Sequence, residues 1–340
     1  MAAIIVLVIL AAFILFANLL WDPAHIYWRE FDRSPEWVIR RRKLEKLREL
    51  RKKGAVKTLF IGDSRSYNLD PQSVGLPSPT FNFTSTTARD EDFLVCYRLV
   101  CKGQDKPPEF LLIGCTAPLF HPTAPLPLEA SVAGEYTAEL IKIGAIPSGV
   151  SLKLCVLFSF EHYRRSFKRL QWLLKKKTNR VSKFQMRDDG ISSWIRKSSP
   201  RDLKKHVKYF PITGLIFKSF DSIRGKRKEW WEQLLDEVSK NGTKIIAYIL
   251  PGGHPDLLKR INDLDGDRIH KMVVEYVGKT VKEHNGLFID LYNPDDSGLT
   301  ADDFRDGIHL MDDAQVKVAL KIADMIKHNG LEIGENSGQS

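Results

Sequence analysis

The sequence predicts a doubly wound α/β fold, in which helices cover both faces of a parallel sheet. Five short apolar runs predict the strands, and they are almost continuously hydrophobic, as strands covered on both faces require. Helical patterns lie between several of these runs, and strand–helix alternation is typical of this fold class. The length of 340 residues fits one large domain with an insertion, or two small domains.

The predicted strands are residues 56–61, 80–83, 109–114, 243–250 and 286–291. The stretch "RDEDFLVCYRLVCK" predicts a helix after the second strand, and "PDLLKRIND" begins a helical region after the fourth. Residues 118–242 break the alternation with a proline-rich stretch followed by helical and polar segments. We expect this section to be a helical insertion over the ligand-binding edge of the sheet.

The first twenty residues predict a membrane anchor, residues 1–20. Residues 2–20 contain no charge and one Asn, a length sufficient to cross a bilayer. Trp21, Tyr27 and Trp28 follow, as in an interfacial aromatic belt, whereas a buried core helix is the alternative. The flanking charges orient the span weakly, and taken literally they favour a cytoplasmic body.

A juxtamembrane segment, residues 21–54, is predicted to contain an amphipathic helix. Ser34 is a possible cap, Pro35 fits the first turn and Gly54 ends the helix. A stripe of Trp37, Leu44 and Leu47 is expected to pack on the body or on the membrane surface. The basic runs "RRRKLEKLRELRKK" and "RRSFKRLQWLLKKK" are interpreted as solvated helix faces. The α/β domain is predicted over 55–330, and residues 331–340 are predicted to be a disordered tail.

The net charge of +10 and the pI near 9.3 suit an anionic partner such as lipid headgroups or a phosphate-bearing polymer. Nucleic acid is not expected, because no RNA-binding aromatic signature, zinc-finger spacing or basic-region zipper is present. The four cysteines, Cys96, Cys101, Cys115 and Cys155, form neither a disulfide framework nor a zinc spacing. We therefore expect no metal and no cofactor.

Gly62-Asp63-Ser64-Arg65 follows the first predicted strand directly and is the first candidate for chemistry. Ligands of open α/β sheets bind at the carboxyl ends of the strands, where a serine on the turn exposes its hydroxyl. The following helix N-terminus offers backbone N–H groups to an oxyanion. Taken alone, Ser64 is more often a helix cap than a nucleophile, because a hydroxyl needs an adjacent base.

The base is expected from the other end of the chain. Asp306 and His309 lie three residues apart in a predicted loop before the last helix. That spacing allows the carboxylate to hold one imidazole nitrogen while the other faces a serine. The joint placement of Ser64 after the first strand and Asp306/His309 in the last loop favours the nucleophile over the cap.

The pair "FIGDSRS" and "DFRDGIHL" resembles the SGNH (GDSL-type) hydrolase superfamily. The resemblance implies a flavodoxin-like three-layer sandwich with a five-stranded parallel sheet, with Ser64 as nucleophile, His309 as base and Asp306 as its orienting group. The segments "NLLWDPAHIY", "FNFTSTTARDEDF" and "YILPGGHPDLL" are similar to a membrane-anchored, extracytoplasmic branch. That branch includes proteins of alginate O-acetylation and of teichoic-acid D-alanylation, so the resemblance places the body outside the cytoplasm.

Two blocks depart from the superfamily pattern, and both concern the oxyanion hole. Where the second block offers a glycine N–H, this chain has "NFTSTT", so a backbone N–H of Thr84 or Ser85 is the expected donor. Where the third block presents an asparagine side chain, this chain has Gly114 in "LLIGCTAPLF", and the resemblance makes Gly114 the expected oxyanion or substrate contact there. The extracytoplasmic branch also tends to lack that asparagine. Loss of one donor costs about 10²- to 10³-fold in rate, which weakens the expectation of efficient hydrolysis.

Three further positions are weighed against structural roles. Arg65 is either a guide for an anionic substrate or a surface ion-pair residue, and His254 either a substrate contact or a loop histidine. Asp188-Asp189-Gly190 lacks the remaining calcium-ligand spacing and is interpreted as a turn.

The resemblance implies a membrane-anchored serine esterase or O-acyltransferase acting on acyl esters of a cell-envelope polysaccharide. Its expected partners are the acylated glycan or an acyl donor, the bilayer, and a membrane-bound O-acyltransferase. Transfer and hydrolysis use the same residues, so the sequence leaves the acceptor open. The alternative is a non-catalytic scaffold or glycan-binding component of a polysaccharide acylation complex.

Overall fold

The structure is a computed structural model that describes residues 2–21, 35–85, 88–121, 134–148, 163, 184–194 and 220–331. The chain divides into two units. One unit combines Met1–Arg42 with Leu126–Lys183, and the other combines Lys43–Pro125 with Phe184–Ser340. The second unit holds the sheet and every predicted site residue, so it is the unit that concerns function.

A five-stranded parallel sheet forms the centre of the second unit, in the order β2-β1-β3-β6-β7. Its strands are β1 (Thr58–Gly62), β2 (Thr80–Asn82), β3 (Phe110–Cys115), β6 (Lys244–Ile249) and β7 (Leu287–Asp290). All five predicted strands are confirmed, and each strand end lies within two residues of its predicted position. Counted along the sheet strands alone, the order is 2-1-3-4-5, so the predicted α/β class is confirmed.

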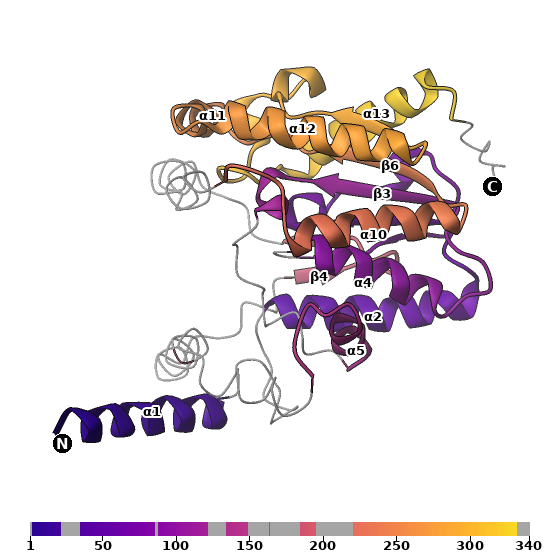
Figure 1. Cartoon of the computed structure of the whole chain (residues 1–340). Helices are drawn as coiled ribbons and strands as arrows, with labels where there is room; N and C mark the ends of the chain where they lie inside the picture. The colour runs from indigo at the N-terminus through magenta and orange to yellow at the C-terminus, as the bar shows by residue number, and fades with distance from the viewer. Residues whose placement is uncertain are drawn as a thin grey trace. The chain divides into compact units, whose positions relative to one another are not determined.

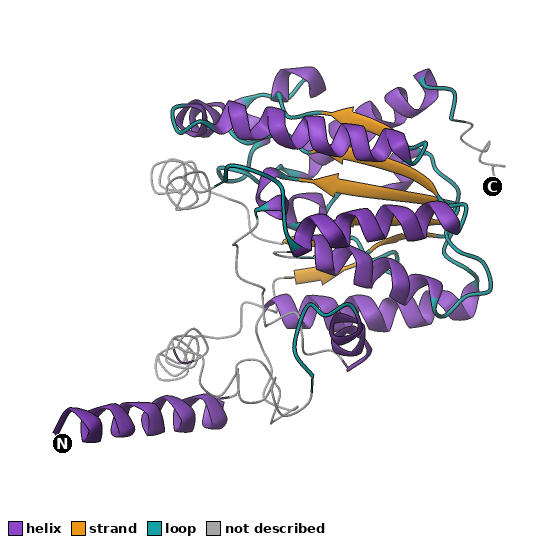
Figure 2. Cartoon of the chain, in the orientation of Figure 1, coloured by secondary structure: helices purple, strands orange, loops and turns teal. Residues whose placement is uncertain are grey.

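Helices flank this sheet, as Figures 1 and 2 show. The helices α4 (Asp90–Cys101), α10 (Lys226–Lys240) and α12 (Gly266–Glu283) pack against one another and contact β1, β6 and β7. The helices α3 (Pro71–Val74) and α13 (Asp312–His328) pack together, and they contact β2 and β7 respectively. Every residue of β1 and β3 is buried, which explains their continuous hydrophobicity in the sequence.

Successive side chains of a strand point to opposite faces of the sheet, so only alternate side chains contact α13. Phe60, Leu112 and Tyr248 share one hydrophobic cluster with side chains of α13. The α13 side of that cluster is formed by Ala314, Val318, Ala319, Ile322 and Ile326. Burial of such an aromatic or aliphatic side chain contributes about 1.5–3 kcal/mol of transfer free energy. This cluster fixes the last helix, and with it the loop that precedes the helix, against the sheet.

The region predicted as a helical insertion is described in part. It contains α5 (Gly134–Lys142) and an antiparallel hairpin that the sequence analysis did not predict, β4 (Phe184–Met186) with β5 (Ser192–Trp194). The predicted turn at Asp188-Asp189-Gly190 joins these two strands, with Gly190 at φ 82°. Helix α10 lies within the predicted insertion, yet it packs on α4 and β6 as part of the layer beside the sheet. The basic run after Tyr163 lies outside the described residues.

The predicted anchor region forms the single helix α1 (Ala2–Trp21). Many of its described apolar side chains are exposed, among them Ile9, Phe13 and Phe16 at 54–62%, whereas Ala17 near its end is buried. Among the described residues, no helix proves long and apolar enough to cross a membrane. The side chains of residues 2–4, 7, 20 and 21 lie outside that description. The anchor therefore stays a prediction.

The predicted amphipathic helix is α2 (Pro35–Lys53), and Gly54 follows it at φ 150°. Leu44 and Leu47 are buried as predicted, whereas the side chain of Trp37 lies outside the described residues. The interpretation of the whole basic run as solvated is wrong at two positions, because Arg40 and Lys43 are 1% and 0% exposed. A buried ammonium group requires hydrogen-bond acceptors, and Lys43 has them beside the candidate site.

Candidate active site

The turn after β1 leaves the hydroxyl of Ser64 available for chemistry. Ser64 is the first residue of a single 3₁₀ turn, η1 (Ser64–Ser66). The residue that caps this turn is Asp63, whose Oδ1 accepts the backbone N–H of Arg65 at 2.9 Å. Since the cap role belongs to Asp63, the choice between cap and reactive group at Ser64 is decided locally against the cap.

Ser64, His309 and Asp306 form a continuous chain of hydrogen bonds. Ser64 Oγ lies 2.9 Å from His309 Nε2, and His309 Nδ1 lies 2.9 Å from Asp306 Oδ2. In the tautomer with the proton on Nδ1, the imidazole donates to Asp306 and Nε2 accepts the Ser64 hydroxyl. The three residues that the sequence analysis selected are therefore brought together, although the serine and the histidine are 245 positions apart in the chain.

Asp306 is held ionised and oriented toward His309 by the hydrogen bonds that its carboxylate accepts. Its Oδ1 accepts the backbone N–H groups of Ile308 and His309, at 3.0 and 2.8 Å. Burial acts to raise the pKa of the Asp306 carboxyl, but the hydrogen bond from His309, the histidine charge and these two N–H donors outweigh burial. The pKa of Asp306 is consequently well below its usual range, so the carboxylate is ionised at neutral pH.

Acid is expected to remove the stability that Asp306 contributes. A carboxyl whose pKa is lowered by folding stabilises the fold fully above its unfolded pKa of about 3.9, and this contribution declines as the pH falls further. The difference in unfolding free energy between wild type and Asp306→Asn should shrink by about 1 kcal/mol between pH 6 and pH 3. Denaturant titrations at the two pH values measure it, and a constant difference would contradict the ionised Asp306.

Two glycines, one in β1 and one in β3, allow η1 to pack closely on these strands. Gly62 and Gly114 face each other across β1 and β3, and the Ser66 side chain lies over both. A Cβ at Gly114 would lie 2.4 Å from Ser66 Oγ and 3.0 Å from the Tyr248 hydroxyl. Gly114 was selected from the sequence as an oxyanion or substrate contact. The structure places it inside β3, where it makes room for the turn that carries Ser64.

Asn82, at the end of β2, binds the polypeptide that follows Ser64. Its side-chain amide donates to the carbonyl groups of Ser66 and Leu69, at 3.1 and 3.2 Å. Its Oδ1 accepts the N–H and the hydroxyl of Thr84, at 3.1 and 2.6 Å. The buried Lys43 Nζ donates to the Asn82 carbonyl at 2.8 Å and lies 3.3 Å from Oδ1. This buried polar network holds the Ser64 turn to the end of β2.

The two backbone donors predicted for the oxyanion hole are engaged elsewhere. The N–H of Thr84 donates to Asn82, and the N–H of Ser85 donates to the Gly62 carbonyl at 3.0 Å. Both residues are also buried, with 0% and 1% exposure. Among the described residues, the N–H of Ser64 itself has no acceptor.

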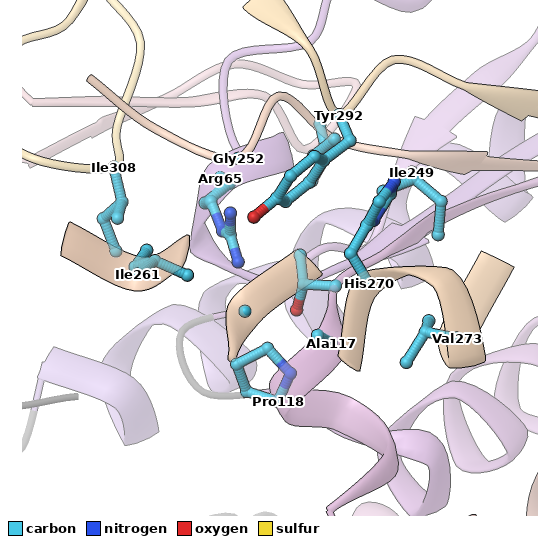
Figure 3. Close-up of a pocket in the computed structure, with 13 residues that line it drawn as sticks. Arg65, Ala117, Pro118, Ile249, Gly252, Ile261, His270, Val273, Tyr292 and Ile308 are labelled. Atoms are coloured by element: carbon cyan, nitrogen blue, oxygen red, sulfur yellow. The ribbon is translucent and has the colours of Figure 1, made fainter. Parts of the chain in front are cut away.

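His254 and Arg65 occupy different positions near the site. His254 is 8% exposed and caps α11 (Pro255–Asn262), with Nδ1 accepting the N–H of Asp256 at 3.2 Å. Its own N–H donates to the Gly307 carbonyl at 2.9 Å, so it supports the loop between Asp306 and His309. Arg65 instead lines a pocket at the carboxyl ends of β3, β6 and β7 (Figure 3).

The sequence analysis missed several residues that build the site. Asn82 lies in a buried strand, and a polar residue at a fully buried strand position is the signal that identifies it. Thr116 donates its hydroxyl to Asp63 Oδ2 at 3.1 Å, and Gln315 donates to the Arg65 carbonyl at 2.7 Å. These two residues hold η1 from β3 and α13, and neither has a sequence signal of its own.

No protein-family model and no curated protein matches the chain. Within the described residues, no group of three or more His, Cys, Asp or Glu side chains is placed to hold a metal ion. Cys96, Cys101 and Cys115 are free thiols, and Cys155 lies outside the described residues.

Proposed function

We propose that this chain is a serine esterase or O-acyltransferase whose catalytic residues are Ser64, His309 and Asp306. The observation that carries the proposal is the pair of 2.9 Å contacts from Ser64 Oγ to His309 Nε2 and from His309 Nδ1 to Asp306 Oδ2. A capping serine would not need an imidazole at hydrogen-bond distance, whereas a nucleophilic serine requires one. An imidazole held by a carboxylate is the arrangement that activates a hydroxyl for acyl transfer.

The reaction follows from this geometry. His309 Nε2 takes the proton of Ser64 as Oγ attacks the ester carbonyl carbon, and Asp306 stabilises the resulting imidazolium. The tetrahedral intermediate collapses to an acyl-Ser64 ester, and the alcohol leaves with the proton from His309. Water or a sugar hydroxyl then attacks the acyl-serine with His309 as base. The proposed donor to the carbonyl oxygen in both steps is the Ser64 N–H, which has no acceptor among the described residues.

The proposed family is the SGNH hydrolase superfamily. Three features support it: the 2-1-3-4-5 strand order, a serine directly after the first strand, and Asp306-x-x-His309 directly before the last helix. The flavodoxin-like order alone is shared by many unrelated proteins, so it supports the fold and not the chemistry. The paired sequence blocks and their meeting in space support the chemistry.

The proposed setting is the cell envelope. We propose that residues 1–20 anchor the chain in the membrane with the body extracytoplasmic, and that the substrate is an acyl ester of an envelope polysaccharide. The uncharged run of Ala2–Leu20 and the exposed apolar side chains of α1 support the anchor. The resemblance to alginate O-acetylation and teichoic-acid D-alanylation proteins supports the glycan, with a membrane-bound O-acyltransferase as partner.

A non-catalytic scaffold or glycan-binding component is the second candidate. One observation favours it: the Thr84 and Ser85 N–H groups, predicted to complete the oxyanion hole, are both buried and engaged. A site with one oxyanion donor retains a nucleophile but loses about 10²- to 10³-fold in rate for each missing donor.

Labelling with a fluorophosphonate probe separates the two candidates. The full chain should react covalently, and peptide mapping should locate the adduct on Ser64. Because the probe requires an activated hydroxyl, His309→Ala should reduce the labelling rate by at least about 10²-fold while Ser64 is still present. An unlabelled wild type, or equal labelling of wild type and His309→Ala, would favour the scaffold.

A further inference from the structure

A partly enclosed pocket lies at the carboxyl ends of β3, β6 and β7 (Figure 3). Arg65 and Ile308, the chain neighbours of Ser64 and His309, both line it. Its walls are mostly apolar, from side chains such as Ile249, Ile261 and Val273. An apolar pocket that is lined by the chain neighbours of the reacting residues is suited to the carbon skeleton of a substrate.

The Arg65 guanidinium is the first of two polar groups in this apolar pocket. Its side chain is 13% exposed, and its Nη1 makes one long hydrogen bond, 3.4 Å, to the Pro251 carbonyl. Asp63 forms an ion pair with this guanidinium, but its Oδ2 lies 3.7 Å from Nε, beyond hydrogen-bond distance. Asp63 already accepts the Arg65 N–H and the Thr116 hydroxyl. Most of the five N–H donors of Arg65 therefore have no acceptor among the described residues.

The Tyr292 hydroxyl is the second polar group. Its ring stacks on His270, with the ring centroids 3.8 Å apart and an interplanar angle of 16°. His270 is held in turn by Asp290, at 3.2 Å. Figure 3 shows the Tyr292 hydroxyl directed toward Arg65, and it has no acceptor among the described residues. Burial, partly offset by the charge of Arg65, raises the pKa of Tyr292 to about 12, so the hydroxyl is a donor at neutral pH.

We propose that this pocket binds a carboxylate of the ester substrate, with Arg65 and Tyr292 as its hydrogen-bond donors. The inference rests on the proposed function and adds the charge of the substrate to it. A guanidinium and a phenol aimed into an apolar pocket match a group with anionic oxygens on a carbon skeleton. Because the ion pair with Asp63 already offsets part of the Arg65 charge, a monoanionic carboxylate suits the pocket better than a phosphate dianion. The carboxylate lies on the acyl side or on the alcohol side of the ester.

The test is a binding titration with the full-length Ser64→Ala chain, which cannot turn the probes over. The acyl-side pair is 4-methylumbelliferyl hemisuccinate and 4-methylumbelliferyl butyrate, which have equal chain length. The alcohol-side pair is 4-acetoxybenzoate and 4-acetoxybenzamide. The anionic member of one pair should bind about tenfold or more tightly than its neutral counterpart, and that pair identifies the side.

Variants in the same background assign the preference to the pocket. Adding Arg65→Gln should abolish the anionic preference, and Tyr292→Phe, which removes only the hydroxyl, should reduce it about threefold or more. Arg268→Gln is the matched control, because Arg268 lies on α12 near the pocket but binds Asp265 and the Phe220 carbonyl. The Arg268→Gln variant should keep the preference for the anionic probe.

Equal binding of both members in both pairs would overturn the inference, as would a preference that Arg65→Gln leaves unchanged. Circular dichroism of each variant checks the fold. Since the titration needs no turnover, its failure is distinguishable from failure of the proposed function, which the labelling of Ser64 in the otherwise wild-type chain tests separately.

Discussion

Replacing Ser64 by alanine should lower the turnover of 4-nitrophenyl acetate by at least about 10⁴-fold, to the background rate. The variant keeps His309 and Asp306 but removes the only atom that forms the covalent intermediate. The loss should fall on kcat, because the small acetyl ester gains little binding energy from one hydroxyl. Initial rates of wild type and variant, measured at equal protein concentration and pH, give the ratio.

Ser73→Ala is the matched control. Ser73 is a partly exposed serine of α3, and its backbone N–H binds Asp70 without the help of its side chain. Its removal should change turnover less than twofold, while thermal unfolding of both variants should stay close to wild type because neither hydroxyl is in the core. Undiminished turnover in Ser64→Ala would exclude the proposed nucleophile, whatever else the chain hydrolyses.

Asn82→Ala should cause the largest loss of stability among single substitutions around the site, about 3 kcal/mol or more. The change leaves the Leu69 carbonyl and the Thr84 N–H without their partner, and it removes one of the two donors to the Ser66 carbonyl, which keeps the N–H of Leu69. Each buried group left unsatisfied costs about 1–3 kcal/mol, and water entry recovers part of the sum. Lys43 also loses the side-chain oxygen that helps to solvate its buried charge. Denaturant titration of the full chain measures the effect.

A surface asparagine provides the comparison. Asn241 ends α10 and makes one side-chain hydrogen bond, to the Tyr97 hydroxyl at 3.0 Å, so Asn241→Ala should cost about 1 kcal/mol. Since the Asn82 network holds the turn that carries Ser64, Asn82→Ala should also lower the fluorophosphonate labelling rate in the fraction that remains folded. Equal losses of unfolding free energy in Asn82→Ala and Asn241→Ala would show that the buried network stabilises the fold no more than a single surface hydrogen bond does.

Much of this fold could be predicted because the hydrophobic runs and the backbone restrictions that define its elements act between residues close together in the chain. A parallel strand covered on both faces must be apolar throughout, so β1, β3 and β6 are recognised as runs in the sequence. The boundaries of α2 were predictable for the same reason, since Pro35 and Gly54 restrict the backbone at each end. The β4–β5 hairpin was missed because its three-residue strands are too short to show a period.

The residues of the candidate site also divide into those that the sequence could predict and those that it could not. Ser64, Asp306 and His309 were selected because their positions relative to the strands and the last helix follow from chain order. The roles of Thr84, Ser85 and Gly114 were not predictable, because they depend on which neighbour takes each N–H group. Lys43 shows the same limit: a lysine in a basic helical run is ordinarily solvated, but here it lies against the carbonyl of Asn82.

The sequence by itself determined the order of the strands along the chain, the residues that form each strand, and the three groups of the proposed triad. Only the tertiary structure decided that Asp63 is the cap, that the hydroxyl of Ser64 faces His309, and that Arg65 and Tyr292 enter one pocket. The physical reason is distance. Hydrophobic period and backbone restriction act within a few residues, whereas a hydrogen bond between residues 245 positions apart exists only once the core has placed β1 and the last loop at one edge of the sheet.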